Sequence, residues 1–205
     1  PAPEPDDGDD PFGFGDGTAG IDDEDEPSLF AMIVKCKRKT GRAVHFDMTN
    51  YCRQAVDHYM KCAGIEKLGF ATTPYAPEGS LHPCDDEIAG ELGSKACSCL
   101  MKDLWAGRLA RPDLQRAIIK LSTRITKWTR NDDKRLKRLM EYMNGTAESH
   151  KLKCFVCDEA DDIELWLFVD ADLAGDREDT KSSTGGYVVL VGPGTWLPIT
   201  WIFLK

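Results

Sequence analysis

Apolar residues recur at intervals of three and four in two neighbouring stretches of the chain, the spacing that places them on one face of a helix. The first stretch, Asp113 to Trp128, has as its apolar positions Leu114, Ala117, Ile118, Leu121, Ile125 and Trp128. The second runs from about Asp132 to Met143, with the stripe Leu136, Leu139, Met140 and Met143. Each stretch predicts an amphipathic helix, and Asn144-Gly145 predicts a left-handed cap at the end of the second.

A third helix is predicted earlier in the chain, from Met48 to Ala63. Thr49 or Asn50 is its expected N-terminal cap, and Gly64 is expected to close it. Residues 66 to 90 contain three prolines and three glycines, a composition that predicts a loop.

Short apolar runs predict strands in the last third of the sequence. Ile163 to Val169 is rich in branched and aromatic residues and ends on Asp170, and Tyr187 to Val191 is a second such run. The stretch TWLPITWIFLK, residues 195 to 205, predicts a third strand. A strand that ends on an aspartate places the carboxylate at the rim of the sheet, where it is hydrated or holds a metal ion.

Two further carboxylates, Asp172 and Asp176, follow Asp170 closely. Mg²⁺ and Mn²⁺ prefer oxygen ligands, and two-metal cleavage of a phosphodiester needs carboxylates that converge from several elements. The same three residues also fit an acidic, solvated turn, because aspartate is a common turn former. The residues alone leave both interpretations open.

The net charge of −9 is unevenly distributed. Residues 1–27 hold eleven of the 35 acidic residues and no Lys or Arg, which leaves 24 acidic against 26 basic residues in the rest of the chain. This Asp-, Gly- and Pro-rich segment has too little apolar surface to offset the entropy of ordering, so a disordered acidic arm is predicted. It is either a solvated linker or an acidic tail that binds a protein partner.

Positive charge gathers in the middle of the chain, where residues 102 to 138 contain twelve basic and four acidic residues. Such a stretch attracts phosphates without reading base sequence. Trp128 lies among these residues and either stacks on a nucleic-acid base or packs in the core. The predicted nucleic-acid-binding residues are Arg124, Lys127, Trp128, Arg130, Lys134, Arg135, Lys137 and Arg138.

Four segments, in this order, resemble the polyprotein of copia-type LTR retrotransposons. They are LWAGRLARPDLQRAIIKLSTRI (residues 104–125), KRLKRLMEYMNGT (134–146), VDADLAG (169–175) and KSSTGGY (181–187). In that family these segments lie between the reverse transcriptase palm and the ribonuclease H core. Asp170 falls on the position of the family's first metal-binding aspartate.

The resemblance implies an α/β fold, in which a mostly helical, polymerase-derived segment is followed by the first three antiparallel strands of an incomplete ribonuclease H-like mixed sheet. The implied boundaries are the arm at 1–27, a thumb- or connection-like C-terminal segment of the reverse transcriptase at 28–150, and a truncated ribonuclease H-like domain at 151–205. The resemblance also implies that Asp170 is a catalytic residue that binds Mg²⁺ or Mn²⁺. The implied partners are an RNA/DNA hybrid and the remainder of the polyprotein.

Two absences limit the activity that the resemblance implies. The paired-aspartate polymerase motif of the family is missing from residues 28 to 205, and the family's catalytic glutamate lies on a helix after the third predicted strand. We therefore expect a catalytically incomplete fragment with nonspecific nucleic-acid affinity and no tightly bound metal. The alternatives are an endonuclease for RNA/DNA hybrids, completed by further sequence or by another chain, and a non-enzymatic protein-interaction module.

The eight cysteines raise a rival hypothesis, a zinc-stabilised domain. Cys154 and Cys157 form a single CxxC, and Cys97 and Cys99 are candidates for two further zinc ligands. The competing interpretation is that the CxxC is a pair of ordinary residues in a strand. The sequence shows no signal peptide or transmembrane run, so an intracellular protein, cytoplasmic or nuclear, with reduced thiols is predicted.

Overall fold

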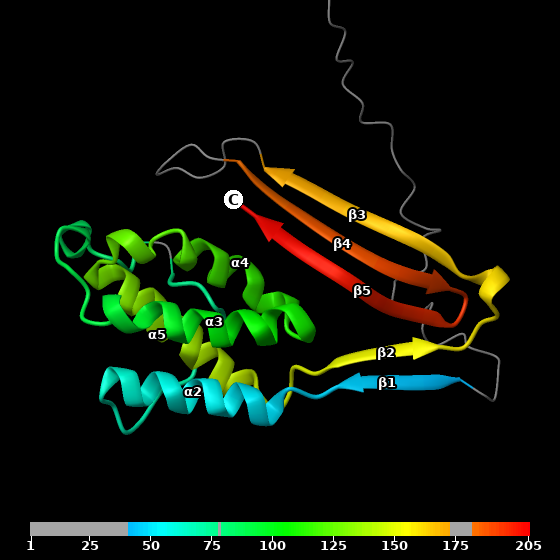
Figure 1. Ribbon diagram of the computed structural model, residues 1–205, viewed down its shortest axis with the longest axis horizontal. Helices are drawn as coiled ribbons and strands as arrows, with labels where there is room; N and C mark the ends of the chain where they lie inside the picture. The colour runs from blue at the N-terminus through cyan, green and yellow to red at the C-terminus, as the bar shows by residue number, and fades with distance from the viewer. Residues whose placement is uncertain (1–40, 78, 173–181) are drawn as a thin grey trace, which may run out of the picture.

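The computed structural model describes residues 41–77, 79–172 and 182–205. The acidic arm predicted for residues 1–27, and Asp176, lie outside this part of the chain. Helices gather on one side of the molecule and strands on the other (Figure 1). The α-helices are α2 (Thr49–Ala63), α3 (Gly93–Leu109), α4 (Pro112–Ser122) and α5 (Arg130–Thr146). The strands are β1 (Arg42–Phe46), β2 (Leu152–Val156), β3 (Glu164–Asp172), β4 (Ser183–Gly192) and β5 (Thr195–Leu204).

The strands form one sheet in the order β1-β2-β5-β4-β3. The last three strands are consecutive antiparallel neighbours, which confirms the three antiparallel strands predicted from the sequence. All pairings among the described strands are antiparallel, so the parallel pairs of a mixed sheet are not found there. β1 was not predicted, whereas β2 contains Cys154, for which a strand was one of the predicted interpretations. β1 precedes all the described helices, yet it pairs with β2, which follows them.

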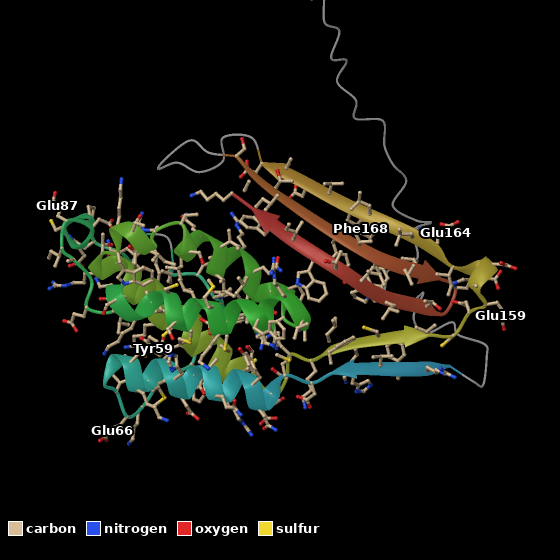
Figure 2. All side chains as sticks on the ribbon, in the orientation of Figure 1. Tyr59, Glu66, Glu87, Glu159, Glu164 and Phe168 are labelled. Carbon is tan, nitrogen blue, oxygen red and sulfur yellow. The ribbon has the colours of Figure 1, made fainter. Side chains whose placement is uncertain are left out.

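The hydrophobic core belongs almost entirely to the helices. The contiguous cluster of buried apolar side chains runs from Cys52 to Ala147 and includes Leu100, Leu114 and Leu136, each fully buried. In the sheet, the described buried hydrophobic residues are Cys154, Val189 and Val191. Side chains accordingly crowd between the helices, whereas those of β3 remain exposed along the whole strand (Figure 2).

Arg111 explains why an Arg-Pro-Asp triplet introduces α4. Its side chain is 1% exposed, and Nε and Nη2 donate to the Asp113 carboxylate, with the shortest contact at 2.7 Å. Nη2 also donates to Thr146 Oγ1 at 2.7 Å, and the Tyr142 hydroxyl donates to Asp113 at 2.9 Å. Pro112 occupies the first turn, where its missing N–H costs nothing. The triplet therefore starts α4 and joins it to the end of α5.

The helix predicted for Asp113 to Trp128 is shorter in the structure. α4 ends at Ser122, a 3₁₀ turn, η2, spans Ile125–Lys127, and Trp128 is extended. This change of direction lets the Arg124 guanidinium reach Asp132 at 2.5 Å and Trp128 Nε1 donate to Asp133 at 2.7 Å. Tertiary hydrogen bonds outweigh the helical periodicity that continues through the sequence.

The left-handed cap predicted at Asn144-Gly145 is also wrong, because α5 continues through both residues to Thr146. Gly145 serves a close approach instead: a Cβ there would lie 3.3 Å from Phe70 Cδ1, so glycine lets the loop pass over the helix. Gly64, in contrast, has the predicted left-handed conformation, with φ of 66°, and closes α2. The N-terminal cap predicted at Thr49 or Asn50 is wrong, because the N-cap position of α2 is Met48. The Thr49 N–H donates instead to the Asp47 carboxylate, just before the helix, at 2.9 Å.

Two hydrogen bonds attach the sheet to the helices. Trp201 Nε1 in β5 donates to the Gly107 carbonyl of α3 at 2.7 Å, and the Gln115 amide of α4 donates to the Trp201 carbonyl at 3.4 Å.

None of the described helices combines the length and the apolar character that a membrane crossing requires.

Candidate functional site

Asp170 lies near the end of β3, with its backbone opposite Gly185 of β4 and with Phe203 of β5 one strand further. Because Gly185 has no side chain, no neighbour on β4 covers the carboxylate, and Asp170 is exposed. Asp172 lies two positions further along β3, so both carboxylates lie on the same face of the sheet. The structure therefore brings together two of the predicted carboxylates.

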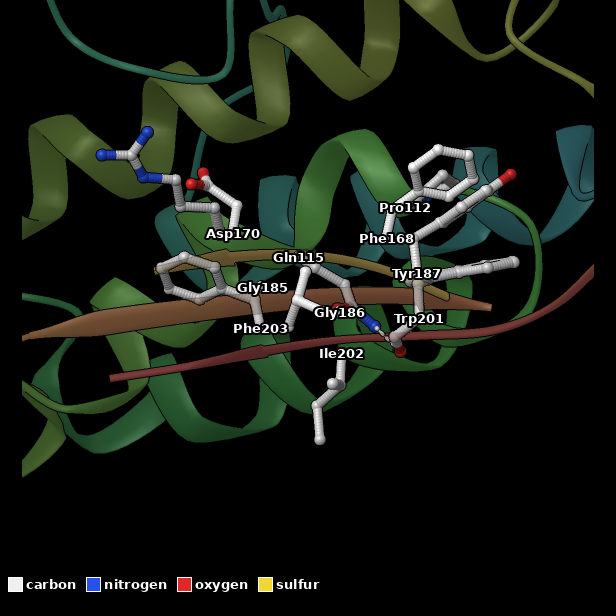
Figure 3. A pocket seen from close by; sticks show the side chains of 12 residues that line it. Pro112, Gln115, Phe168, Asp170, Gly185, Gly186, Tyr187, Trp201, Ile202 and Phe203 are labelled. Carbon is white, nitrogen blue, oxygen red and sulfur yellow. Dashed lines mark hydrogen bonds between the residues drawn. The ribbon is translucent and has the colours of Figure 1, made fainter. Parts of the chain in front are cut away.

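The Asp170 side of the sheet meets α4 in a shallow pocket of about 320 Å³. Pro112, Gln115 and Arg116 line it from α4, and Phe168, Asp170, Tyr187, Trp201 and Phe203 are among the lining residues of the sheet. Asp170 lies at one end of the pocket, next to Phe203, and the rings of Phe168 and Tyr187 lie at the other end (Figure 3). The pocket is thus mostly apolar and contains several aromatic rings, with one carboxylate and one guanidinium.

Arg116 was not predicted to belong with Asp170. Its guanidinium lies over the Tyr75 ring, 5.7 Å from the ring centre, which holds the charge at the mouth of the pocket. The sequence offers one signal for the role of Arg116, a basic residue on the exposed face of α4. This signal could be used only once α4 was known to pack against β5.

Among the described residues, the donor set around Asp170 is smaller than a two-metal site needs. Asp170 and Asp172 could supply two carboxylates to Mg²⁺ or Mn²⁺, but among the described residues no group of three potential ligand side chains includes either of them. Octahedral Mg²⁺ is held by a few protein oxygens together with water or substrate phosphates, and two-metal cleavage needs a bridging set of carboxylates. We derive no hydrolytic step from this arrangement.

The predicted nucleic-acid-binding residues lie along η2 and α5, and most of their charge is already paired. Two aspartates of a 3₁₀ turn, η1 (Pro83–Asp86), lie against the first turns of α5. The pairs are Arg124 with Asp86 and Asp132, Arg130 and Lys134 with Asp85, Arg135 with Asp86 and Asp132, and Lys137 with Glu141. The local excess of positive charge in the sequence is therefore partly cancelled by acids from a distant loop.

Asp85 and Asp132 show the strength of this pairing. The Lys134 ammonium, 2.6 Å from Asp85, holds the pKa of that carboxyl below its usual value. Asp132 is fully buried, and although burial raises its pKa, the hydrogen bonds from Arg124, the Thr129 backbone and Arg135 outweigh burial and lower the pKa overall. Both acids are thus held as anions beside the basic residues.

The other three predicted residues differ in what they offer to a ligand. Lys127 is exposed. Arg138 donates to the Thr73 carbonyl at 3.1 Å, so its guanidinium holds the loop against α5. Trp128 is 7% exposed and its indole N–H is bonded to Asp133, which favours the core role over base stacking. Among the predicted residues, Lys127 is the one most accessible to phosphate.

The rival zinc set is not assembled in the structure. Cys154 is fully buried within β2, and Cys157 follows that strand with its backbone N–H donated to Thr195 Oγ1 at 3.1 Å. Among the described residues, no group of three potential ligands contains either cysteine. The interpretation of the CxxC as two ordinary residues fits this geometry.

A scan against protein-family models and searches of curated proteins and of solved structures found no match to this chain.

Proposed function

We propose that this chain is a catalytically incomplete segment of a copia-type reverse transcriptase and ribonuclease H polyprotein, with weak, nonspecific affinity for nucleic acid. The observation that supports it most is the antiparallel β3-β4-β5 meander, whose first strand carries Asp170 and Asp172 on one face. The order of this meander after a helical unit with a basic helix matches the order of the four resembling segments.

The affinity is expected to be low because the basic residues must exchange internal partners for phosphates. A lysine or arginine that binds a phosphate releases counterions and adds roughly 0.9 to the salt slope of the binding constant. A lysine or arginine that already pairs with Asp85 or Asp86 contributes less to the affinity for nucleic acid. The acidic turn η1 therefore limits nucleic-acid binding on α5.

The test uses fluorescence anisotropy of a labelled RNA/DNA hybrid at several salt concentrations. We expect weak, salt-dependent binding by the wild-type chain and tighter binding, by about tenfold or more, after the double substitution Asp85→Asn/Asp86→Asn, because Arg130 and Lys134 then become available. Lys127→Ala should weaken binding.

The matched control is Asp161→Asn/Asp162→Asn, which changes the net charge equally. These residues belong to a 3₁₀ turn, η3 (Ala160–Asp162), at the end of the sheet that lies far from the helices (Figure 1). Equal effects of the two double substitutions would mean that only net charge matters. Absent or salt-independent binding by the wild-type chain would overturn the proposed nucleic-acid affinity.

A further inference from the structure

Three soft ligand side chains meet where α2 packs against α3. His58 and Cys62 are four residues apart on α2 and so share one face of that helix, and Cys99 approaches them from α3. One ligand atom from each residue lies within 4.8 Å of the other two, and Cys62 Sγ lies 3.7 Å from His58 Nε2. Among the described residues, this is the one group of three or more His, Cys, Asp or Glu side chains with such a geometry.

The cluster lies at the boundary between core and solvent. Cys99 is 1% exposed, and His58 and Cys62 are half-buried, so an ion can enter from the solvent side and be held from the core side. The neighbouring Tyr59 is 2% exposed and lies between α2 and α3, which marks the same interface (Figure 2). The two helices already fix the backbones that carry the three ligands.

The distance between the two ligand atoms of α2 suits a tetrahedral ion. With a Zn–N bond of about 2.0 Å and a Zn–S bond of about 2.3 Å, tetrahedral geometry separates a nitrogen and a sulfur ligand by about 3.5 Å. The observed 3.7 Å between His58 Nε2 and Cys62 Sγ matches that separation. Thiolate and imidazole ligands select zinc over Mg²⁺ or Ca²⁺.

We propose that His58, Cys62 and Cys99 form a zinc-binding site that joins α2 to α3, with water as the fourth ligand. The hydroxyl of Ser98, 2.9 Å from His58 Nε2, turns away from the imidazole when the ion binds. Two thiolates and a neutral imidazole leave the occupied site without net charge. This inference does not depend on the proposed relation to retrotransposon polyproteins.

The protonation of the three ligands makes zinc binding at this site depend on pH. Zinc binds cysteine as the thiolate and histidine as the neutral imidazole. A zinc ion displaces the thiol protons, and binding should weaken as the pH falls.

The test titrates the reduced, metal-free full chain with Zn²⁺ and with Co²⁺. We expect about one equivalent bound per chain, and a thiolate-to-cobalt charge-transfer band with the visible bands of tetrahedral Co²⁺. His58→Ala and Cys62→Ser, at half-buried positions, should each lower the affinity by about tenfold or more. Added zinc should raise the melting temperature of the wild-type chain and leave that of Cys62→Ser unchanged.

The control is Cys97→Ser, which removes an exposed thiol two positions from Cys99 and should leave metal binding unchanged. Circular dichroism of each variant checks that the helices are intact. The proposal is overturned if the wild-type chain binds no stoichiometric metal, or if His58→Ala and Cys62→Ser bind it as tightly as Cys97→Ser does.

Discussion

Asp103 of α3 is a carboxyl group in an apolar environment. It is fully buried, and neither carboxylate oxygen has a hydrogen-bond partner among the described residues. Burial raises the pKa of Asp103 well above its ordinary value, so the folded chain holds the group protonated. The unfolded chain ionises it near its ordinary pKa of 3.8, and folding near neutral pH must therefore take up a proton.

The substitution Asp103→Asn should reveal this cost. A raised folded-state pKa contributes stability that is full below about pH 4 and is lost as the pH rises above it, because the unfolded state then loses its proton. The asparagine variant is neutral at every pH, so it should gain on the wild type between pH 4 and pH 7. One proton taken up on folding changes the stability by about 1.4 kcal/mol per pH unit, so the expected gain approaches about 4 kcal/mol between pH 4 and pH 7, measured by urea unfolding at both pH values.

The exposed Asp57→Asn on α2 is the control and should show no such gain. A stability difference between Asp103→Asn and wild type that is the same at pH 4 and pH 7 would contradict a buried, protonated Asp103.

For single residues, the sequence predicted which side chains share a face better than it predicted which side chains form ion pairs. The carboxylates of Asp170 and Asp172 share a face as alternation along a strand requires. The pairing of Arg130 and Lys134 with Asp85 could not be predicted, because Asp85 reaches them from about fifty positions away in a loop with no periodicity. Counting charge within one stretch therefore overestimated the free positive charge on α5.

Among the elements, β3 is the least protected. It lies at an edge of the sheet, and Leu165, Leu167 and Val169, which alternate onto its outer face, are 66, 63 and 67% exposed. Ile202 and Leu204 of β5 are 51 and 54% exposed. An exposed apolar edge strand is a site for pairing with another chain.

Replacing Leu167 by lysine should reduce this association. Because Leu167 is already exposed, the free energy of unfolding should change by about 0.5 kcal/mol or less, while aggregation and binding of the dye ANS should fall. Light scattering on heating and ANS fluorescence measure the two effects. The control is Thr184→Lys on β4, which adds the same charge at an exposed position without removing an apolar side chain; an equal effect there would show that charge alone is responsible.

Element ends were the least predictable part of the fold. The periodicity of α5 was sufficient to find that helix, and Gly64 marked the end of α2 correctly. Gly145 is also a glycine, but it is needed for a different reason, because Phe70 passes over α5 at this position. The sequence alone does not position the loop that carries Phe70. A short strand such as β1 carries too weak a pattern to be found before its partner β2 is known.

For the whole molecule, the location of the core predicts which part folds alone. The hydrophobic cluster and the partly buried side chains packed on it lie between Met48 and Ala147. A fragment of residues 47–151 should therefore keep its helical circular-dichroism signal and unfold cooperatively on heating. It loses the two hydrogen bonds between Trp201 and the helices, so it should be less stable than the full chain.

The matched control is the same fragment with Leu136→Asp, since Leu136 is fully buried in α5 and a carboxylate there should abolish the transition. A wild-type fragment without a cooperative transition would mean that the sheet is required for the helical core to form.

The pairing of β1 with β2 has a consequence for the order of folding. Phe46 lies opposite Leu152, and Lys151 Nζ lies 2.8 Å from Asp47, so the two ends of the helical unit lie side by side. Val44 and Cys154 are 110 positions apart, and closing a loop of that length is entropically costly until the chain between them is compact. Contacts within the helical unit shorten that loop, so we expect the pairing of β1 with β2 to form after the helical core. The helical unit is, in topological terms, an insertion into a hairpin.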